Sequence, residues 1–310
     1  MTAGLPKLSI ITPTLNRRRF LEDAIQSVLS QDYPEFEHII VDGGSNDGTL
    51  ELLAQFPHLR VVSEKDSGLY DALSKGVAMA RGEVIGHLNS DDVYAPGAFH
   101  RIAAPFRDDA GVDAVFGGAI AFEDTAGGAR RTVVEYLTPS HSALSWENVT
   151  IGVPIVNARF FRRGVYDRVG TYDARYRIAA DRDFLIRVAL ADVRSVQVPG
   201  AVYHYRMHGG SLSLSGERAS FGAIHAEHLT MSERYLAMRG LSRAHRAHFE
   251  RWHANEAMLA TVLATREFRF HDAFQAGLRG WRQDALWPLF VASKVIPRIA
   301  RMPFRRAHAR

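Results

Sequence analysis

The stretch that decides the fold is Glu83-Val-Ile-Gly-His-Leu-Asn-Ser-Asp-Asp92. Residues 84–88 form a short, mostly apolar run, which is typical of a buried strand. The run gives way to polar residues that end in Asp91 and Asp92. Two adjacent carboxylates at the end of a buried strand repel each other, and a divalent cation or ligand hydroxyls would relieve that repulsion. A helix N-cap is the alternative, but a cap needs only one Asp, so the pair favours a metal and ligand site.

Strands alternate with helices around this stretch. Apolar runs of strand length are each followed by a segment with helical periodicity, at residues 8–12 and 17–30, 37–41 and 49–53, and 60–63 and 68–81. This alternation predicts an α/β fold with a mostly parallel twisted sheet flanked by helices. In such sheets ligands bind at the carboxyl ends of the strands, where the polar clusters of this chain fall.

The middle of the chain is less regular. We expect strands at residues 114–116, 131–136 and 196–205, helices at 160–169 and 181–190, and a loop rich in Gly and Ser at 207–215. After Glu217 the composition changes to Ala, Arg, His, Glu and Leu with helical spacing, and Gly240 divides this part into at least two helices. The expected domains are therefore residues 1–215 and a C-terminal helical region, 216–310.

Composition excludes several classes of function. The 310 residues are 46% hydrophobic and 23% charged, as in an ordinary globular protein. There is no Cys, which excludes disulfides and thiol chemistry and fits a reducing cytoplasm. Residues 1–7 lack the layout of a signal peptide, and no apolar run reaches the roughly 18 residues of a membrane span. The pI is about 9.4, but we expect no nucleic-acid partner because no nucleic-acid module is recognisable.

Five motifs, in their order and spacing, resemble those of the family-2 glycosyltransferases, which have the GT-A nucleotide-diphospho-sugar transferase fold. They are Thr12-Pro-Thr-Leu-Asn16, Val41-Asp-Gly-Gly-Ser-Asn-Asp-Gly-Thr49, Glu64-Lys-Asp-Ser-Gly-Leu-Tyr-Asp-Ala-Leu-Ser-Lys-Gly76, Asn89-Ser-Asp-Asp92 and Ala180-Asp-Arg-Asp-Phe184. The resemblance covers roughly the first 215 residues. It implies inverting transfer of a sugar from a nucleotide-diphosphate donor, a UDP-sugar being favoured, to a glycan or lipid-linked acceptor, as in similar bacterial enzymes of surface-polysaccharide synthesis.

The resemblance also implies a donor site. Asp92 would bind Mn²⁺ or Mg²⁺, Asp91 would contact the ribose or also support the metal, and Asp42 would receive the nucleobase edge. The other implied donor contacts are Thr12, Pro13, Thr14, Asn16, Ser45, Asp66, Asp71, Lys75 and Asn89. Two alternatives are that Asp42 with its two following glycines forms only a turn, and that Asp71 and Lys75 form only an i,i+4 surface pair.

Asp181 is the implied catalytic base, because an inverting mechanism needs a carboxylate on the face opposite the leaving group. The family usually has Glu-Asp at this point, whereas this chain has Ala180-Asp181. We expect Asp183, two residues further on, to be structural. The alternative for Asp181 is a helix N-cap.

Arg206 and His208 resemble the loop with which the family closes over the diphosphate. Alternate residues of an extended segment face the same way, so both could reach one anion. His208 is either a third metal ligand or a phosphate contact. Acceptor selection is expected in residues 117–160, where Val156 and Asn157 replace the His-Gln often seen in similar sequences.

Two competing functions remain. A nucleotide-dependent dehydrogenase is disfavoured, because no Gly-x-Gly-x-x-Gly follows the first strand. A non-catalytic nucleotide-sugar or glycan-binding protein of the same fold is favoured only by the missing Glu at Ala180. In the helical region, His225 and His228 have metal-ligand spacing, but no nearby acid fits a template, and we expect them at the helix surface. Phe249 and Trp252 are expected in the core.

The tail carries six Lys or Arg residues and no acid from Leu286 to Arg310. Lys294, Arg298, Arg301 and Arg305 recur along one side of a helix, and Pro297 and Pro303 are expected to kink or divide that helix. The apolar residues of the tail are Trp287, Leu289, Phe290, Val291, Val295, Ile296, Ile299, Met302 and Phe304. Such a segment could bind an anionic membrane surface, placing the enzyme peripherally at the inner face of the cell membrane. The alternative is a tail that packs on the catalytic domain.

Overall fold

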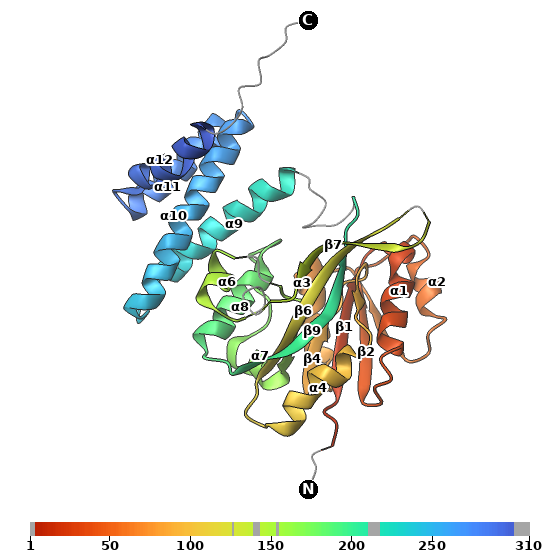
Figure 1. Cartoon of the computed structure of the whole chain (residues 1–310). Coiled ribbons are helices and arrows are strands. Elements are labelled where there is room, and N and C mark those ends of the chain that lie inside the picture. Colours follow the sequence, from red (N-terminus) through yellow and green to blue (C-terminus); the bar gives the residue numbers. More distant parts are fainter. Residues whose placement is uncertain (1–3, 126, 139–142, 153–154, 210–217, 301–310) are drawn as a thin grey trace, which may run out of the picture. The chain divides into compact units, whose positions relative to one another are not determined.

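The computed structural model describes residues 4–125, 127–138, 143–152, 155–209 and 218–300. The chain divides into two compact units, Met1–Gly216 and Glu217–Arg310. The first is a sheet flanked by helices, and the described part of the second is helical (Figure 1). The strands are β1 Leu8–Thr14, β2 Phe36–Asp42, β3 Leu59–Ser63, β4 Val84–His87, β5 Val93–Tyr94, β6 Ala114–Asp124, β7 Arg130–Tyr136, β8 Arg159–Arg162 and β9 Ser195–Arg206. The helices of the first unit are α1 Arg18–Leu29, α2 Thr49–Leu53, α3 Leu69–Met79, α4 Ala98–Asp108, α6 Trp146–Thr150, α7 Arg163–Val169 and α8 Ala180–Leu190.

The sheet has the order β3-β2-β1-β4-β8-β6-β9-β5, and β7 pairs with β6. The expected parallel arrangement is found in β3-β2-β1-β4 and again between β6 and β9. Elsewhere the sheet is antiparallel, because β8 runs opposite to both of its neighbours and β7 returns from β6 through a short loop. A short loop can only join antiparallel strands, whereas parallel strands need a crossover. The α/β fold is as predicted, with a mixed rather than mostly parallel sheet.

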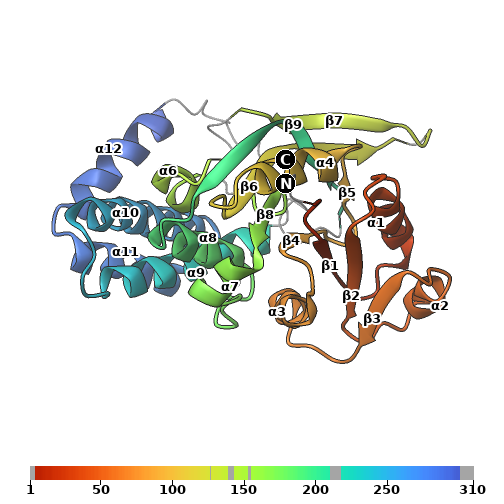
Figure 2. The same cartoon turned by 90° about the horizontal axis from the view of Figure 1, so that it is seen from below.

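Helices cover both faces of the sheet. α1, α2 and α4 pack on one face, and α3, α7 and α8 lie on the other (Figure 2). Successive residues of β1 serve the two sides, since Ile10 joins the core beneath α1 and α4 while Ile11 meets α3. A Cβ on Gly76 of α3 would lie only 2.3 Å from Ile11 Cγ2, so the glycine lets this helix approach β1 closely.

Residues 160–169 differ from the expected single helix. They form the end of strand β8 followed by the short helix α7. Phe160 and Phe161 are both buried but face opposite sides, Phe160 against Phe99 and Phe161 against Phe184. A strand buried on both faces is apolar throughout, so a short run of this kind cannot be told from helix by periodicity.

The second unit contains four described helices, α9 Arg218–Leu236, α10 Arg243–Arg266, α11 Phe270–Gln283 and α12 Trp287–Ala300. Phe249 and Trp252 are fully buried, as predicted. α12 continues through Pro297, so that proline does not divide the helix, and Pro303 lies outside the described residues. Trp287 packs in a core with Leu229 and Met258 and is not available as a membrane contact. Among the described residues, no helix combines the length and apolarity needed to cross a membrane.

Candidate active site at the carboxyl ends of the strands

The loops after β1 and β2 are bound to each other. Thr14 and Asp42 are register partners at the ends of these strands. Beyond them, the N–H of Asn16 donates to Ser45 Oγ at 2.7 Å, and the N–H of Asn46 donates to Asn16 Oδ1 at 2.9 Å. Asn16 has a left-handed φ of 53°, which Asn tolerates better than most residues. The predicted contacts Asn16 and Ser45 therefore shape one shared loop surface.

The carboxylate of Asp42 is fully buried and is surrounded by donors from its own neighbourhood. Oδ2 accepts from the N–H groups of Gly44 and Ser45 at 3.1 and 3.0 Å and from Ser63 Oγ at 2.6 Å. Ser45 Oγ donates to Oδ1. Asp42 thus makes the contacts expected if it and the two following glycines form only a turn. A nucleobase would have to replace one of these donors.

A direct contact with a ligand has more support at Thr14 than at Asp42. Its hydroxyl is buried, and within the described residues no hydrogen-bond partner lies within reach of Oγ1. A buried hydroxyl without a partner is costly, and a ligand that supplied one would be favoured. Thr12, by contrast, pairs through Oγ1 with His38 Nε2 at 2.9 Å, and Pro13 is buried in β1. Asp66 lies against the backbone of Gly43, because a Cβ on that glycine would be 2.8 Å from Asp66 Oδ2.

Asp71 and Lys75 form the surface pair that the sequence allowed. Lys75 Nζ lies 3.5 Å from Asp71 Oδ2 and 2.8 Å from Glu64 Oε1. Asp71 also accepts from the N–H of Ser67 at 2.9 Å. These contacts stabilise the start of α3, and a donor contact at either side chain stays a prediction.

Asp92 is buried after β4 and is held by three donors. Its Oδ2 accepts from Tyr203 Oη at 2.8 Å and from Asn89 Nδ2 at 3.0 Å, and its Oδ1 accepts from the N–H of Arg206 at 2.7 Å. Burial raises the pKa of Asp92 well above its usual range, and the charge of Asp91 raises it further, while the three donors oppose the rise. The ionised pair is therefore electrostatically strained without a nearby cation.

Asp91 is more exposed than Asp92 and faces His208. The distance from His208 Nε2 to Asp91 Oδ2 is 3.0 Å, and the imidazole ring lies 4.6 Å from the ring of Phe20 between centroids. A carboxylate and an imidazole that converge in this way can share a divalent cation of the Mn²⁺ type. The donor set and the raised pKa of Asp92 both fit the metal that the fold family implies.

Arg206 is placed differently from the predicted diphosphate contact. Its guanidinium is buried, pairs with Asp124 and with Asp23 (2.5 Å to Oδ2), and donates through Nε to the backbone oxygen of Asp91 at 2.9 Å. The rings of Phe20 and Phe122 flank it, each about 5.0 Å from the guanidinium carbon. These contacts make Arg206 a support for the Asp91–Asp92 loop, and its contact with diphosphate stays a prediction.

Asp181 lies in the first turn of α8 and is half-buried. Burial raises the pKa of its carboxyl group above the usual range, although the N–H and charge of Arg182 and the hydroxyl of Tyr70 oppose the rise. Asp183 is fully buried and pairs with Arg187 at 2.8 Å, which matches the structural role expected for it. A carboxylate of raised pKa at the rim of a site suits proton abstraction.

Tyr205 on β9 is buried and is affected by the charges of both Asp92 and Asp181. Burial raises the pKa of its phenol strongly, and the charges of Asp92 and Asp181 both contribute to the rise. The hydroxyl also accepts from the N–H of Asn157 at 3.3 Å. The predicted metal ligand Asp92 and the predicted base Asp181 therefore lie within electrostatic reach of one side chain.

Arg159 is a candidate that the sequence reasoning missed. Its side chain is 2% exposed, and Nε donates to the backbone oxygen of Ile155 at 2.7 Å. The guanidinium stacks 5.1 Å from the ring centroid of Phe116, yet within the described residues neither Nη1 nor Nη2 has a hydrogen-bond partner. Burial lowers the pKa of Arg159 to about 10, with Tyr205 opposing the shift, so it stays charged at neutral pH. No sequence motif marks this position.

Comparison with known proteins gives a consistent result. The sequence model of glycosyl transferase family 2 matches residues 9–170. A PGL/p-HBAD biosynthesis glycosyltransferase of Mycobacterium bovis is 34% identical over 189 residues, which cover 59% of this chain and 69% of that protein. TarS 1–349 of S. aureus, solved with UDP-GlcNAc, superposes with a TM-score of 0.64 at 21% identity, covering 94% of this chain and 88% of that one. The mannosyltransferase PcManGT of Pyrobaculum calidifontis, solved with GDP-Man and Mn²⁺, gives 0.60 at 17% identity, with coverages of 96% and 83%.

Proposed function

This chain belongs to glycosyl transferase family 2 and is a glycosyltransferase, and on that premise we propose that it moves a sugar, with inversion and with a divalent metal, from a nucleotide-diphosphate donor to an acceptor hydroxyl. The observation that carries the proposal is the convergence of Asp91, Asp92 and His208 beyond β4, with Asp181 sharing the surroundings of Tyr205. The group of Asp91, Asp92 and His208 suits an anionic donor with its cation, and Asp181 suits removal of the proton from the acceptor hydroxyl.

The donor occupies the surface between the β1 and β2 loops and the Asp91–Asp92 loop. Thr14 offers a hydroxyl to the nucleoside, with its register partner Asp42 and with Asp66, which lies beside Gly43, close by. A UDP-sugar is the favoured donor, and the UDP-GlcNAc complex of the similar TarS supports this choice. Because PcManGT was solved with GDP-Man, a guanine nucleotide is the first competitor to test.

Asp91, Asp92 and His208 would hold Mn²⁺ or Mg²⁺. When bound, the cation neutralises negative charge that gathers on the leaving diphosphate. Arg206 fixes the loop that carries these ligands by binding the backbone oxygen of Asp91, and its own charge is balanced by Asp23 and Asp124. The protein thereby prepares the ligand geometry before the donor arrives.

Asp181 accepts the proton of the acceptor hydroxyl. The hydroxyl oxygen then forms a bond to the anomeric carbon while the bond from that carbon to the diphosphate oxygen breaks, and the electron pair leaves with the diphosphate. Because attack and departure occur on opposite faces, the configuration at the anomeric carbon inverts. The raised pKa of Asp181 makes its carboxylate a stronger base than an exposed one.

The acceptor is a glycan or a lipid-linked glycan. Arg159 would contact an oxygen of the acceptor, since its buried guanidinium nitrogens lack partners within the described residues and Tyr205 lies nearby. The similarity to a PGL/p-HBAD biosynthesis enzyme supports a role in making surface glycans or glycolipids. Contact with an anionic membrane at the inner face of the cell membrane would bring the enzyme to a lipid-linked acceptor.

A screen of donors tests this function. UDP- and GDP-sugars are added with and without Mn²⁺, binding is measured by thermal shift, and donors that bind are assayed for hydrolysis and transfer. We expect metal-dependent binding of a UDP-sugar and slow release of UDP. Tight binding with no turnover of any donor would favour the non-catalytic alternative, for which Ala180 in place of the usual Glu is the only indication.

A further inference from the structure

His225 and His228 are not at the helix surface, which corrects the expectation drawn from sequence. They lie on α9, one half-buried and one buried, and face the buried Glu256 of α10. One ligand atom from each of these three residues lies within 4.8 Å of the others. Sequence spacing does not reveal this acid, because Glu256 lies 28 positions after His228 and on the next helix.

The geometry of the cluster is close to that of a metal site. His225 Nδ1 lies 2.5 Å from Glu256 Oε2, and His228 Nδ1 lies 3.3 Å from Glu256 Oε1. In a tetrahedral zinc site, with Zn–N and Zn–O distances of about 2.0–2.2 Å, neighbouring ligand atoms are about 3.3 Å apart. The two distances to Glu256 lie within about 1 Å of that spacing, and the three ligand atoms all lie within 4.8 Å of one another, so the side chains are close to the arrangement that a zinc ion needs.

We propose that His225, His228 and Glu256 form a zinc-binding site that joins α9 to α10 and is distinct from the catalytic metal centre. Two imidazoles and one carboxylate are ligands that Zn²⁺ uses, with a water in the fourth position. Mg²⁺ and Ca²⁺ prefer all-oxygen ligands, and Mn²⁺ stands lowest in affinity among the divalent first-row transition metals. The site should therefore choose Zn²⁺ from a mixture in which the catalytic centre takes Mn²⁺ or Mg²⁺.

The surroundings of Glu256 favour a fixed site. Trp252 Nε1 donates to Glu256 Oε1 at 2.9 Å, and this indole is fully buried and lies 5.7 Å from the imidazole of His228 between ring centroids. Groups that orient a ligating carboxylate in this way raise metal affinity. The adjacent Leu229 and Ala257 are buried in an apolar cluster, which keeps bulk water from competing for the ligands.

The alternative is a buried network of hydrogen bonds between the same three side chains. Measuring zinc binding distinguishes this network from a metal site. The full chain carrying Asp92→Asn, to disable the catalytic centre, is stripped with chelator and dialysed against ZnCl₂. Metal analysis should find one zinc per chain, and Co²⁺ in its place should give visible absorption typical of tetrahedral N and O ligands. Zinc should raise the melting temperature by about 5 °C, since it binds the folded state selectively.

Variants assign the zinc to these residues. In the same background His225→Ala, at the half-buried position, and Glu256→Gln, which preserves volume, should each lose the bound zinc and the zinc-dependent shift. His271→Ala, an exposed His on α11, should keep both. The proposal is wrong if His225→Ala retains one zinc. It is also wrong if no zinc binds the parent chain and Glu256→Gln lowers the melting temperature equally with and without zinc, because the site is then a hydrogen-bond network.

Discussion

The hydroxyl of Tyr203 on β9 donates a 2.8 Å hydrogen bond to Oδ2 of Asp92, which lies beyond the end of β4. The same hydroxyl accepts from the N–H of Asn89 at 3.0 Å and from the side-chain amide of Asn157 at 3.2 Å. One phenol thus joins the predicted metal ligand, its loop and the segment that precedes β8. The orientation of Asp92 depends on a residue 111 positions away in the chain.

We therefore expect Tyr203→Phe to weaken metal-dependent UDP binding by about 10–100-fold, the usual effect of losing a group that orients a metal ligand. The protein should stay folded but lose about 1–3 kcal/mol of stability, because two donors lose their acceptor. Calorimetric titration of UDP at several Mn²⁺ concentrations measures the first effect, and urea unfolding measures the second.

Tyr33→Phe is the matched control. The Tyr33 hydroxyl donates to the backbone oxygen of Pro6 at 2.6 Å, before β1 and so at the opposite end of the sheet. It should cost stability without changing metal-dependent binding. Equal effects of the two variants on UDP binding would show that Tyr203 acts only through general stability.

Asp92→Asn should abolish transfer and metal-dependent donor binding, because a hard cation needs the charge of the carboxylate. The fold should tolerate the change, since burial and Asp91 already raise the pKa of Asp92 and disfavour its ionised form. Asp192→Asn, at an exposed position with a left-handed φ of 50° that Asn accepts, is the control. Unchanged transfer with the usual dependence on metal would remove Asp92 from the site.

A structural feature can be predicted from this sequence when the contacts that form it are local. The strand that ends before Asp91 and Asp92 is evident because apolar residues give way abruptly to polar ones, and in the structure that strand ends at His87, within one residue of the expected end. The partners of these carboxylates, Tyr203, Arg206 and His208, come from β9 and the residues after it, and β5 lies beside β9 only because of the sheet order. Such contacts follow from topology, which a strand pattern alone does not determine.

Two further residues show the same limit. Arg159 is one basic residue among several in residues 159–163, and only the fold places its guanidinium in the interior. Strand β8 itself was expected to be helix, because an apolar run buried on both faces has no alternation to reveal it. Asp42 shows the converse case, since its Gly-Gly turn is readable from sequence while the full set of donors around the carboxylate is not.

Asp181→Asn should lower turnover by about 10²–10⁴-fold, the range for removing a general base, and leave donor affinity nearly unchanged. Single-turnover rates with donor bound, together with the dissociation constant of the donor, separate the two effects. Asp167→Asn on the exposed side of α7 serves as the control. A collapse of donor binding with normal turnover of bound donor would make Asp181 a donor contact instead of the base.

The pH profile of the parent enzyme provides a separate test of the base. Burial raises the pKa of Asp181 above the usual value of about 3.9, and the carboxylate must be ionised to accept a proton. Turnover should therefore be full at higher pH and fall as the pH drops through this raised pKa. An acid limb at or below the ordinary Asp value would contradict the assignment, provided the protein remains folded there.

Arg159→Met should reduce kcat/KM for the acceptor by at least about tenfold, while donor hydrolysis in the absence of acceptor stays near its parent rate. Met keeps much of the side-chain volume and removes a buried charge that lacks partners at both Nη atoms within the described residues. Replacing such a charge with an apolar group is often neutral or stabilising, so the melting temperature should hold or rise. A marked loss of stability with unchanged acceptor kinetics would make Arg159 purely structural.

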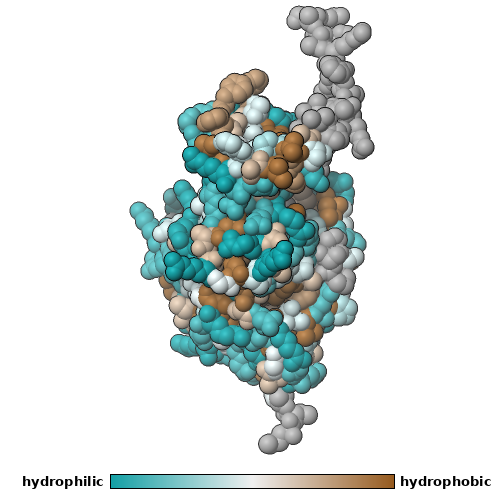
Figure 3. Space-filling model, turned by 90° about the vertical axis from the view of Figure 1, so that its left-hand side faces the viewer, coloured by the Kyte–Doolittle hydropathy of each residue, from teal (hydrophilic) through white to brown (hydrophobic). Residues whose placement is uncertain are grey.

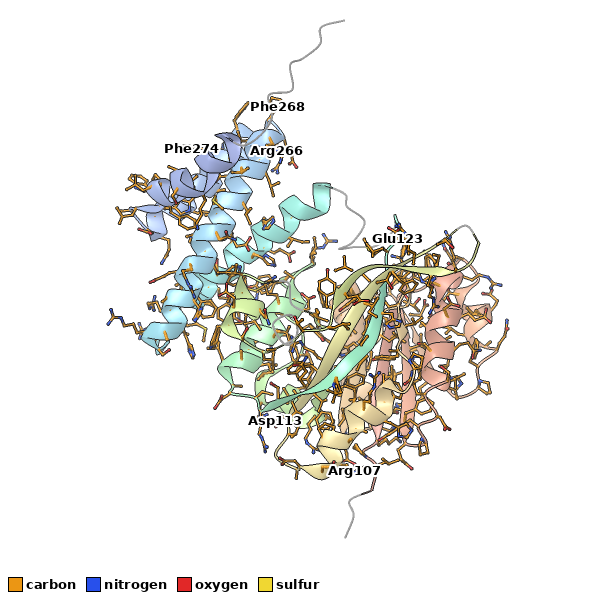
Figure 4. All side chains as sticks on the ribbon, in the orientation of Figure 1. Arg107, Asp113, Glu123, Arg266, Phe268 and Phe274 are labelled. Atoms are coloured by element: carbon orange, nitrogen blue, oxygen red, sulfur yellow. The ribbon has the colours of Figure 1, made fainter. Side chains whose placement is uncertain are left out.

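The helical unit exposes aromatic side chains that suit a membrane surface better than the buried Trp287. Phe268, Phe270 and Phe274 are 81%, 64% and 66% exposed. Figure 4 labels the first and third of them where α10 passes into α11, together with Arg266. The space-filling view likewise shows hydrophobic residues reaching the surface of this unit among hydrophilic ones (Figure 3). Further exposed residues of suitable kind are Arg269, Trp281, Arg282, Leu286, Leu289 and Lys294.

The last prediction is that this surface binds anionic membranes. Aromatic rings enter the headgroup boundary, and each basic residue near an anionic surface adds about 1 kcal/mol at modest ionic strength. The protein should co-sediment with vesicles that contain anionic lipid and be released by high salt.

The triple change Phe268→Ser, Phe270→Ser and Phe274→Ser should reduce this binding strongly while leaving donor binding intact. Removing the whole tail, residues 286–310, is a poor test because Trp287 belongs to the core of the unit. Removal of residues 301–310 alone should measure the contribution of the end of the tail. Val133→Ser with Val134→Ser, which removes exposed apolar surface from β7, is the control. Equal sedimentation with neutral vesicles, or undiminished binding by the triple variant, would rule out this surface as the membrane contact.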